Sequence, residues 1–212
     1  MKKTKMMKKN HPVELILASH SPRRRELLAG LDIEFRVWVL EDIDESYPEE
    51  LPAEEVPVYL SKSKARAYRD VISDDQLVIT ADTVVVLGDA VLGKPADRDE
   101  AVDMLRSLSG HTHRVITGVA LTTTSEQRTF SVVSEVTFKV LSEEEIAYYV
   151  DVYKPYDKAG AYGIQEWIGY VGVTQLSGSY FNVMGLPVQR IYQELVDMCG
   201  REALIRGDKA RP

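Results

Sequence analysis

Three arginines directly after a serine and a proline are the first chemically unusual feature of the sequence. Ser21 and Pro22 have the residue types that begin a helix, with serine as N-cap and proline in the first turn, and Arg23, Arg24 and Arg25 follow. The N-terminal end of a helix carries partial positive charge, so three guanidinium groups destabilise it unless an anion neutralises them. Free backbone N–H groups beside guanidinium groups predict a phosphate site, and arginines that only extend into solvent are the alternative.

An aspartate lies inside the most apolar stretch of the chain, residues 77–87. Aspartate is unfavourable in strands, and a buried carboxylate is costly unless it is paired or binds a metal. We therefore expect Asp82 at a break in this strand, lining a cleft, where it could hold Mg²⁺ or act as a general base. The alternative is a turn in which Asp82 caps a backbone amide. Thr83 beside it offers a hydroxyl to a substrate or to a metal-bound water.

Two lysines, Lys94 and Lys158, lie in loops of small residues. Little backbone bulk would prevent a polyphosphate from approaching them. Either lysine alone is more often a solvent-exposed turn residue, but both together with the arginines predict a phosphate-rich ligand. Asp44 and Glu45 at the acidic loop could supply further metal ligands, although a run of charges is usually a solvated face.

Several common kinds of site are excluded. The sequence has no P-loop and no dinucleotide-binding glycine pattern. Ser21 lacks the histidine and aspartate pattern of a serine nucleophile. The single cysteine, Cys199, cannot form an internal disulfide or a zinc site, so we expect an inert core residue and a cytoplasmic location. We interpret His111 and His113 as surface or strand-end residues rather than ligands.

Strands and helices alternate along the chain and must position these residues. The pattern predicts strands at 14–18, 33–39, 77–87, 115–124 and 130–140, and helices at 22–30, 57–69, 97–108, after Ser142 and from Pro187 onward. Asp97 with Glu100, and Ser142 with Glu145, have the spacing of capping boxes. The expected fold is an α/β domain with a mixed sheet and helices on its faces.

Length and charge limit the class of protein. The chain has 212 residues, 44% of them hydrophobic and 28% charged, which is the balance of a soluble globular protein. No apolar run approaches the roughly 20 residues of a membrane span, and a net charge of -7 makes nucleic acid an improbable partner. We expect residues 1–12 to be a disordered lysine-rich leader, residues 13–200 to form one catalytic domain, and residues 201–212 to be a polar tail.

The motifs in their order along the chain resemble a known family. They are LASHSPRRRELL at 17–28, ADTV at 81–84, LGKP at 92–95, TGV at 117–119, KAGAYGIQ at 158–165 and GSYFNVMGLP at 178–187. From about Leu15 to Leu195 the sequence is similar to the Maf family of nucleoside triphosphate pyrophosphatases. This resemblance implies hydrolysis of the α–β phosphoanhydride, which releases a nucleoside monophosphate and pyrophosphate. It also implies an elongated mixed β-sheet flanked by helices, as in the ITPase-like fold, with a substrate cleft between two lobes.

The resemblance further implies a divalent cation, Mg²⁺ or Mn²⁺, and a homodimer. Asp82 matches the catalytic carboxylate and Glu45 an acidic position of the cleft, so both are expected metal ligands, and Lys94 is expected to act with Asp82 in catalysis. Arg23, Thr83 and Gln165 match positions linked to substrate choice. The remaining expected substrate-binding residues are Ser19, Ser21, Arg24, Lys64 and Lys158.

The identity of the base is predicted from one position. Ile164 and Gln165 resemble the subgroup that cleaves dTTP and UTP, whereas the subgroup linked to 7-methyl-GTP usually has serine and glutamate there. A carboxamide both donates and accepts, so Gln165 could read the imide edge of thymine or uracil. Two alternatives stay open: a nucleotide-binding regulator of septum formation without significant catalysis, and a pyrophosphatase for 7-methyl-GTP, ITP or XTP.

Overall fold

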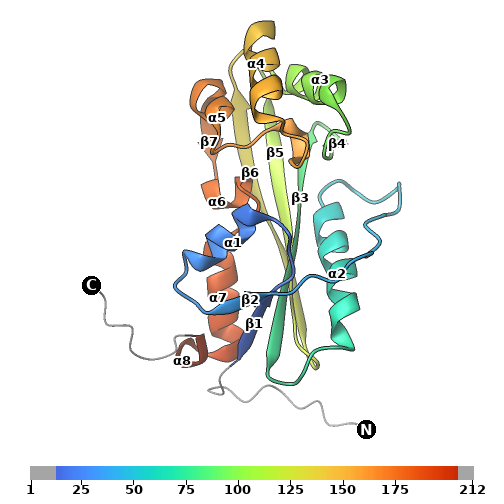
Figure 1. The fold of residues 1–212 in the computed structure, drawn as a ribbon, viewed down its shortest axis with the longest axis vertical. Coiled ribbons are helices and arrows are strands. Elements are labelled where there is room, and N and C mark those ends of the chain that lie inside the picture. Colours follow the sequence, from blue (N-terminus) through green and yellow to red (C-terminus); the bar gives the residue numbers. More distant parts are fainter. Residues whose placement is uncertain (1–12, 205–212) are drawn as a thin grey trace, which may run out of the picture.

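The computed structural model describes residues 13–204, which form a mixed β-sheet with helices on both faces (Figure 1). Within these residues the sheet has seven strands in the order β2-β1-β3-β5-β6-β7, and β4 pairs with β3. The strands are β1 (Glu14–Leu17), β2 (Phe35–Val37), β3 (Gln76–Leu87), β4 (Ala90–Leu92), β5 (Thr112–Thr122), β6 (Gln127–Phe138) and β7 (Val173–Ser177). Strands β1, β2 and β3 are parallel, and the other pairings are antiparallel.

Five of the described helices fall close to the positions expected from the sequence, and the four short ones at 159–161, 167–172, 180–183 and 201–204 were not expected. The helices are α1 (Pro22–Ala29), α2 (Val56–Arg69), α3 (Arg98–Leu108), α4 (Glu143–Tyr153), the 3₁₀ helix η1 (Ala159–Ala161), α5 (Trp167–Gly172), α6 (Tyr180–Val183), α7 (Val188–Cys199) and α8 (Arg201–Leu204). No helix within residues 13–204 is long and apolar enough to cross a membrane.

Helix caps explain several of these starts. The side chain of Ser142 accepts the backbone N–H of Glu145, whose carboxylate accepts the N–H of Ser142, which confirms the capping box of α4. Asp97 likewise accepts the N–H of Glu100 at the start of α3, at 3.0 Å. The Glu100 carboxylate bonds to the N–H of Ala96 rather than to that of Asp97, at 2.6 Å. The predicted box at α3 is therefore only half formed.

Strands β3, β5 and β6 run the length of the molecule and join two lobes (Figure 1). We call the part with β1, β2, α1, α2, α7 and α8 the lower lobe, and the part with β4, α3, α4, η1 and α5 the upper lobe. Each lobe has its own hydrophobic core: α1 and α7 pack on β1 and β3 in the lower lobe, and α3, α4 and α5 pack on β5 and β6 in the upper lobe. The long strands therefore fix the distance between the lobes.

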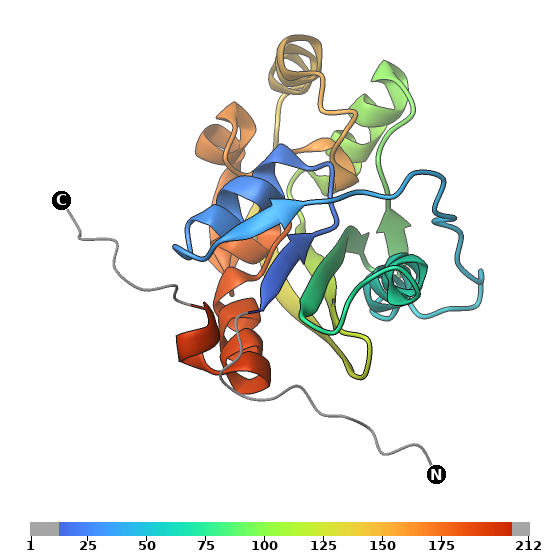
Figure 2. The same cartoon turned by 60° about the horizontal axis from the view of Figure 1, so that its bottom comes forward.

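Helix α2 covers the opposite face of the sheet from α7 (Figure 2). It comes unusually close to β5 at Gly118, because a Cβ there would lie 2.2 Å from the carbonyl carbon of Pro57 in α2. Gly118 pairs with Asp82 across the β3–β5 ladder, so the two residues share one face of the sheet. The glycine thus lets α2 approach the face on which Asp82 lies.

Strand β3 is continuous through Asp82, which corrects the expectation of a break at this residue. A different feature makes room for the carboxylate. β1 pairs with β3 only as far as Ile79, and β4 pairs with it only from Val85. Between them, within the described chain, residues 80–84 form an edge that neither strand covers. The aspartate therefore sits at an open sheet edge between the lobes.

The packed part of the chain reaches Leu204. Ala203 and Leu204 of α8 are buried against the lower-lobe core, so four residues of the segment expected as a polar tail belong to the fold. Apolar side chains at these two positions account for the packing. The expected leader at 1–12 and the rest of the tail at 205–212 lie outside the described residues.

Candidate active site

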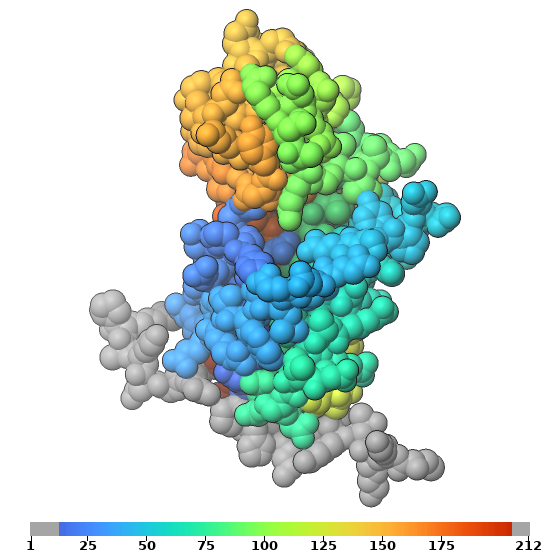
Figure 3. All heavy atoms as spheres, turned by 45° about the vertical axis from the view of Figure 1, so that its right-hand side comes forward, coloured from blue at the N-terminus to red at the C-terminus, as the bar shows by residue number. Residues whose placement is uncertain are grey.

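A cleft of about 450 Å³ lies beside the open edge of β3, between the two lobes. Figure 3 shows the surface hollowed where the blue N-terminal segment meets the green and orange segments of the upper lobe. Most of the residues that the sequence suggested for the site line this one cleft, and Arg25 and Asp44 do not. Those that line it are Ser19, Ser21, Arg23, Arg24, Glu45, Lys64, Asp82, Thr83, Lys94, Lys158 and Gln165.

Asp82 is paired with a lysine from α2. Lys64 Nζ lies 2.7 Å from Asp82 Oδ1 and 3.2 Å from Glu45 Oε1. The side chains of Lys64 and Asp82 are each only 14% exposed. A carboxylate this buried needs an opposite charge, and the close approach of α2 at Gly118 supplies it. One ammonium therefore holds the two carboxylates that the sequence suggested as metal ligands.

The same two carboxylates fit a metal ion that comes with phosphate groups. Among the described residues, no group of three or more His, Cys, Asp or Glu side chains could hold a metal ion. Mg²⁺, however, typically binds through one or two carboxylates, several waters and the oxygens of substrate phosphates. Asp82 and Glu45 converge on one cation, so they fit this second mode and not an all-protein cage.

The Arg24 guanidinium donates three hydrogen bonds to oxygen atoms of the protein. Its Nε and Nη1 each bond to a backbone carbonyl at 2.8 Å, those of Gly185 and Ala81. Its Nη2 donates to Thr83 Oγ1 at 3.0 Å. The guanidinium thereby joins α1 to the open edge of β3 and to the loop after α6, which is a positioning role within the cleft.

Thr83 belongs to a hydroxyl network that sequence reasoning missed. Its Oγ1 lies 2.9 Å from Oγ1 of Thr117, which donates to the carbonyl of Asn182 at 3.2 Å. Asn182 is fully buried, and its amide donates to Val115 O at 3.1 Å and to Ser134 Oγ at 3.0 Å. The position of Asn182 inside the motif at 178–187 could have indicated this residue from the sequence. The network fixes the hydroxyl of Thr83 at the cleft.

Two serines organise the turn before α1. Ser21 is the N-cap of α1 and accepts the N–H of Arg24 at 3.4 Å, and Ser19 Oγ accepts the N–H of Ser21 at 3.2 Å.

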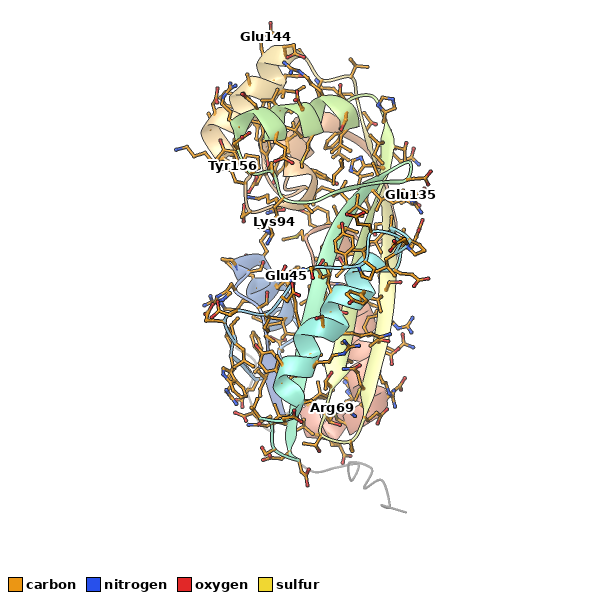
Figure 4. All side chains as sticks on the ribbon, turned by 90° about the vertical axis from the view of Figure 1, so that its right-hand side faces the viewer. Glu45, Arg69, Lys94, Glu135, Glu144 and Tyr156 are labelled. Carbon is orange, nitrogen blue, oxygen red and sulfur yellow. The ribbon has the colours of Figure 1, made fainter. Side chains whose placement is uncertain are left out.

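Lys94 faces this turn from the other lobe. It is exposed and forms no ion pair within the described chain, and Figure 4 shows it pointing from the upper lobe toward Glu45. Lys94 is therefore a cation still available to an anionic ligand.

An ion pair crosses the cleft between the lobes. Asp157 Oδ2 accepts from Arg23 Nη1 at 2.7 Å, and Asp157 Oδ1 accepts from Lys158 Nζ at 2.7 Å. Lys158 is buried and also lies 3.1 Å from Glu166 Oε1. Partial burial opposes ionisation of Asp157, but the Lys158 ammonium and the Arg23 guanidinium hold its pKa at about 2. Asp157 and Glu166 were not singled out from the sequence, because acidic side chains in loops are common.

The segment with Gln165 is held from behind by Tyr149 of α4. The hydroxyl of this buried tyrosine accepts the N–H of Gly163 at 3.0 Å and donates to the Glu166 carboxylate. Burial, and then the neighbouring Glu166 carboxylate, raise the pKa of Tyr149 far above its usual range. Gln165 Oε1 is buried without a hydrogen-bond partner among the described residues, although the side chain lines the cleft. The loop thus presents a carboxamide with unused bonding capacity.

Comparison with known proteins agrees with this geometry. Residues 14–198 match the family model described as Maf-like protein. The chain belongs to the Maf family. The resemblance drawn from the motifs is thereby confirmed.

Individual relatives of this Maf protein are close. A dTTP/UTP pyrophosphatase of Parabacteroides distasonis is 59% identical over 182 residues, which are 86% of this chain and 94% of that protein. One of Phocaeicola vulgatus is 60% identical over 190 residues, 90% of this chain and 98% of that protein. Among solved structures, a dITP/XTP pyrophosphatase from Mycobacterium abscessus is 12% identical, covers 86% of this chain and 94% of that one, and has a TM-score of 0.41.

One histidine of this Maf protein is more buried than its sequence suggested. His113 lies at the start of β5, as expected, but it is buried in the upper lobe, where its Nε2 lies 2.8 Å from the hydroxyl of Tyr162. Burial lowers its pKa to about 4, so it is neutral at pH 7. β5 begins at Thr112, earlier than expected, and the next residue therefore points into the core.

Proposed function

We propose that this Maf protein hydrolyses dTTP and UTP to the nucleoside monophosphate and pyrophosphate. The relatives with 59% and 60% identity over nearly the whole chain, both named dTTP/UTP pyrophosphatase, support this activity. The observation that carries the proposal is the cleft, in which the largely buried Asp82 carboxylate and Lys94, which has no ion pair within residues 13–204, line one space of about 450 Å³. That volume lies in the ordinary range for a small-molecule site.

Asp82 is the proposed general base. It accepts a proton from a water molecule whose oxygen forms a bond to the α-phosphorus, while the bond from that phosphorus to the α–β bridging oxygen breaks. Lys94 neutralises the charge that develops on the departing pyrophosphate. Lys64 holds the Asp82 carboxylate in place at 2.7 Å, so the base needs little reorganisation before it acts.

Asp82 and Glu45 are the proposed ligands of Mg²⁺ or Mn²⁺. When bound, the ion neutralises phosphate oxygens and helps to align the triphosphate. We place the triphosphate at the turn before α1, near Ser19, Ser21 and Arg23. Arg24, which is bonded to backbone carbonyls, positions Thr83 there.

Gln165 is the proposed reader of the base. Its amide can donate to a carbonyl of thymine or uracil, and its unpartnered Oε1 can accept the imide N–H. Gln165→Ala should therefore lower the ratio of kcat/KM for dTTP to that for GTP by roughly 2- to 13-fold, since such a bond contributes about 0.5–1.5 kcal/mol. Gln165→Glu should lower activity further, because the carboxylate cannot donate to the base carbonyl and its negative charge repels a nearby phosphate.

The experiment measures pyrophosphate release from dTTP, UTP, GTP, 7-methyl-GTP and ITP, for wild type and Gln165→Ala. The proposal requires dTTP and UTP to be the best substrates of the wild type. A preference for ITP or 7-methyl-GTP would replace the substrate assignment, and nucleotide binding without release would favour a regulatory binder. An unchanged dTTP to GTP ratio in Gln165→Ala would remove the base-reading role. We also propose a homodimer, which light scattering on the purified protein tests.

A further inference from the structure

Asp157 holds two cations from the two sides of the cleft. Arg23 belongs to α1 in the lower lobe, and Lys158 precedes η1 in the upper lobe. Each binds a different oxygen of the same carboxylate, and both distances are 2.7 Å. The carboxylate is ionised at pH 7, because its pKa is about 2. An anion of the protein itself therefore bridges the lobes across the cleft.

The two cations are ones that a triphosphate would use. Guanidinium and ammonium groups bind carboxylate and phosphate oxygens with the same short, charge-assisted hydrogen bonds. Lys158 is further neutralised by Glu166 at 3.1 Å, so it has little charge left for a ligand while Asp157 stays in place. Lys94, in contrast, has no ion-pair partner in the described part of the chain. Asp157 occupies Nη1 of Arg23, so a phosphate group that binds this atom must displace Asp157.

We propose that the Asp157 carboxylate competes with phosphate groups for Arg23 and Lys158. It binds these two cations in the nucleotide-free cleft and binds them again as inorganic pyrophosphate leaves. This inference rests on the proposed function, since it concerns the substrate and product of that reaction. The Arg23 side chain is 23% exposed and the Asp157 side chain 59%, so both have solvent to move into. Asp157 weakens pyrophosphate binding and thereby speeds product release.

Asp157→Asn is the sharpest perturbation, because it keeps the shape of the side chain and removes its charge. The freed cations should bind pyrophosphate about tenfold more tightly or better, as expected when a charge-assisted competitor is lost. KM for UTP should fall, and kcat should fall with it if pyrophosphate release limits turnover. A merely structural role would instead raise KM.

Isothermal titration with inorganic pyrophosphate tests this on wild type, Asp157→Asn and Asp157→Ala. Asp151→Asn is the matched control, since Asp151 pairs with Arg98 at 2.6 Å on the upper lobe and does not line the cleft. Tighter binding in both Asp157 variants, with Asp151→Asn unchanged, supports the proposal. Equal or weaker binding overturns it and assigns Asp157 to holding Arg23 in place.

The same proteins are assayed with UTP, which separates this inference from the proposed function. If the wild type releases UMP and pyrophosphate while the Asp157 variants do not bind pyrophosphate more tightly, only the competitor role falls. If the wild type neither cleaves UTP nor binds pyrophosphate, the proposed function falls and the competitor role with it.

Discussion

Gly118→Ala should damage the cleft without replacing any residue that lines it. The new Cβ would lie 2.2 Å from the carbonyl carbon of Pro57, whereas non-bonded carbons rest about 3.5–4.0 Å apart. Helix α2 must then move outward by about 1–2 Å, and Lys64 moves with it, away from the carboxylate of Asp82 that it now contacts at 2.7 Å. Overpacking of this kind costs about 1–3 kcal/mol of folding stability.

Two measurements follow from that displacement. The midpoint of thermal unfolding should fall by roughly 2–12 °C, since 1 kcal/mol corresponds to about 2–4 °C in a chain of this size. kcat/KM for UTP should fall by up to about 100-fold, which a 1 Å misplacement in an active site can cost.

Gly30→Ala is the control, because its φ of -63° suits any residue and its nearest contact is 3.3 Å. A Gly118→Ala protein with wild-type activity and stability would show that the approach of α2 does not position Lys64.

Three further outcomes are expected. Lys94→Ala should lower kcat/KM for every good nucleotide substrate to a similar degree, by about 13- to 150-fold, because the phosphate groups are the same whatever the base. Pyrophosphate release from the same five nucleotides measures this, and a loss of activity on one base alone would contradict it. Tyr149→Phe should raise KM for UTP and lower the free energy of unfolding by about 1–3 kcal/mol in urea, because Gly163 and Glu166 lose a buried partner. Tyr153→Phe on the same helix is the control and should change neither KM nor stability. Asp157 has a depressed folded pKa of about 2, so its ion pairs stabilise the fold above the unfolded pKa near 3.8 and lose that effect as the pH falls toward 2. The Asp157 side chain is 59% exposed and solvent screens its charge, so the free energy of unfolding of the wild type should exceed that of Asp157→Asn by only about 0.5–1 kcal/mol at pH 5. In urea titrations this difference in unfolding free energy should disappear between about pH 4 and pH 2.

Local patterns carried much of the fold. The apolar run that became β3 and the caps at Ser21 and Ser142 are set by neighbouring residues, so their elements could be predicted. The continuity of β3 through Asp82 could not be, because it depends on where β1 stops pairing and β4 begins. An aspartate within a strand looks like a break until the open edge beside it is known.

The contacts of the site residues with residues distant in the sequence could not be predicted. Arg24 has the residue type of a phosphate ligand, yet its contacts are the carbonyls of Ala81 and Gly185, which only the tertiary fold brings to it. Lys158 was expected to face a ligand, and it lines the cleft, but its present partners are Asp157 and Glu166. Residue type and spacing indicate a charge but not what already binds it.

The products of UTP hydrolysis by wild type and by Asp82→Asn test the central claim most directly. The substitution keeps the shape of the side chain and removes the charge that accepts a proton and binds the metal ion. We expect the wild type with Mg²⁺ to give UMP and pyrophosphate in equal amounts. Asp82→Asn should stay folded by circular dichroism and lose at least about 10²–10⁴-fold in kcat. Release of UDP and phosphate, or a folded Asp82→Asn protein with more than about a tenth of wild-type kcat, would contradict the account.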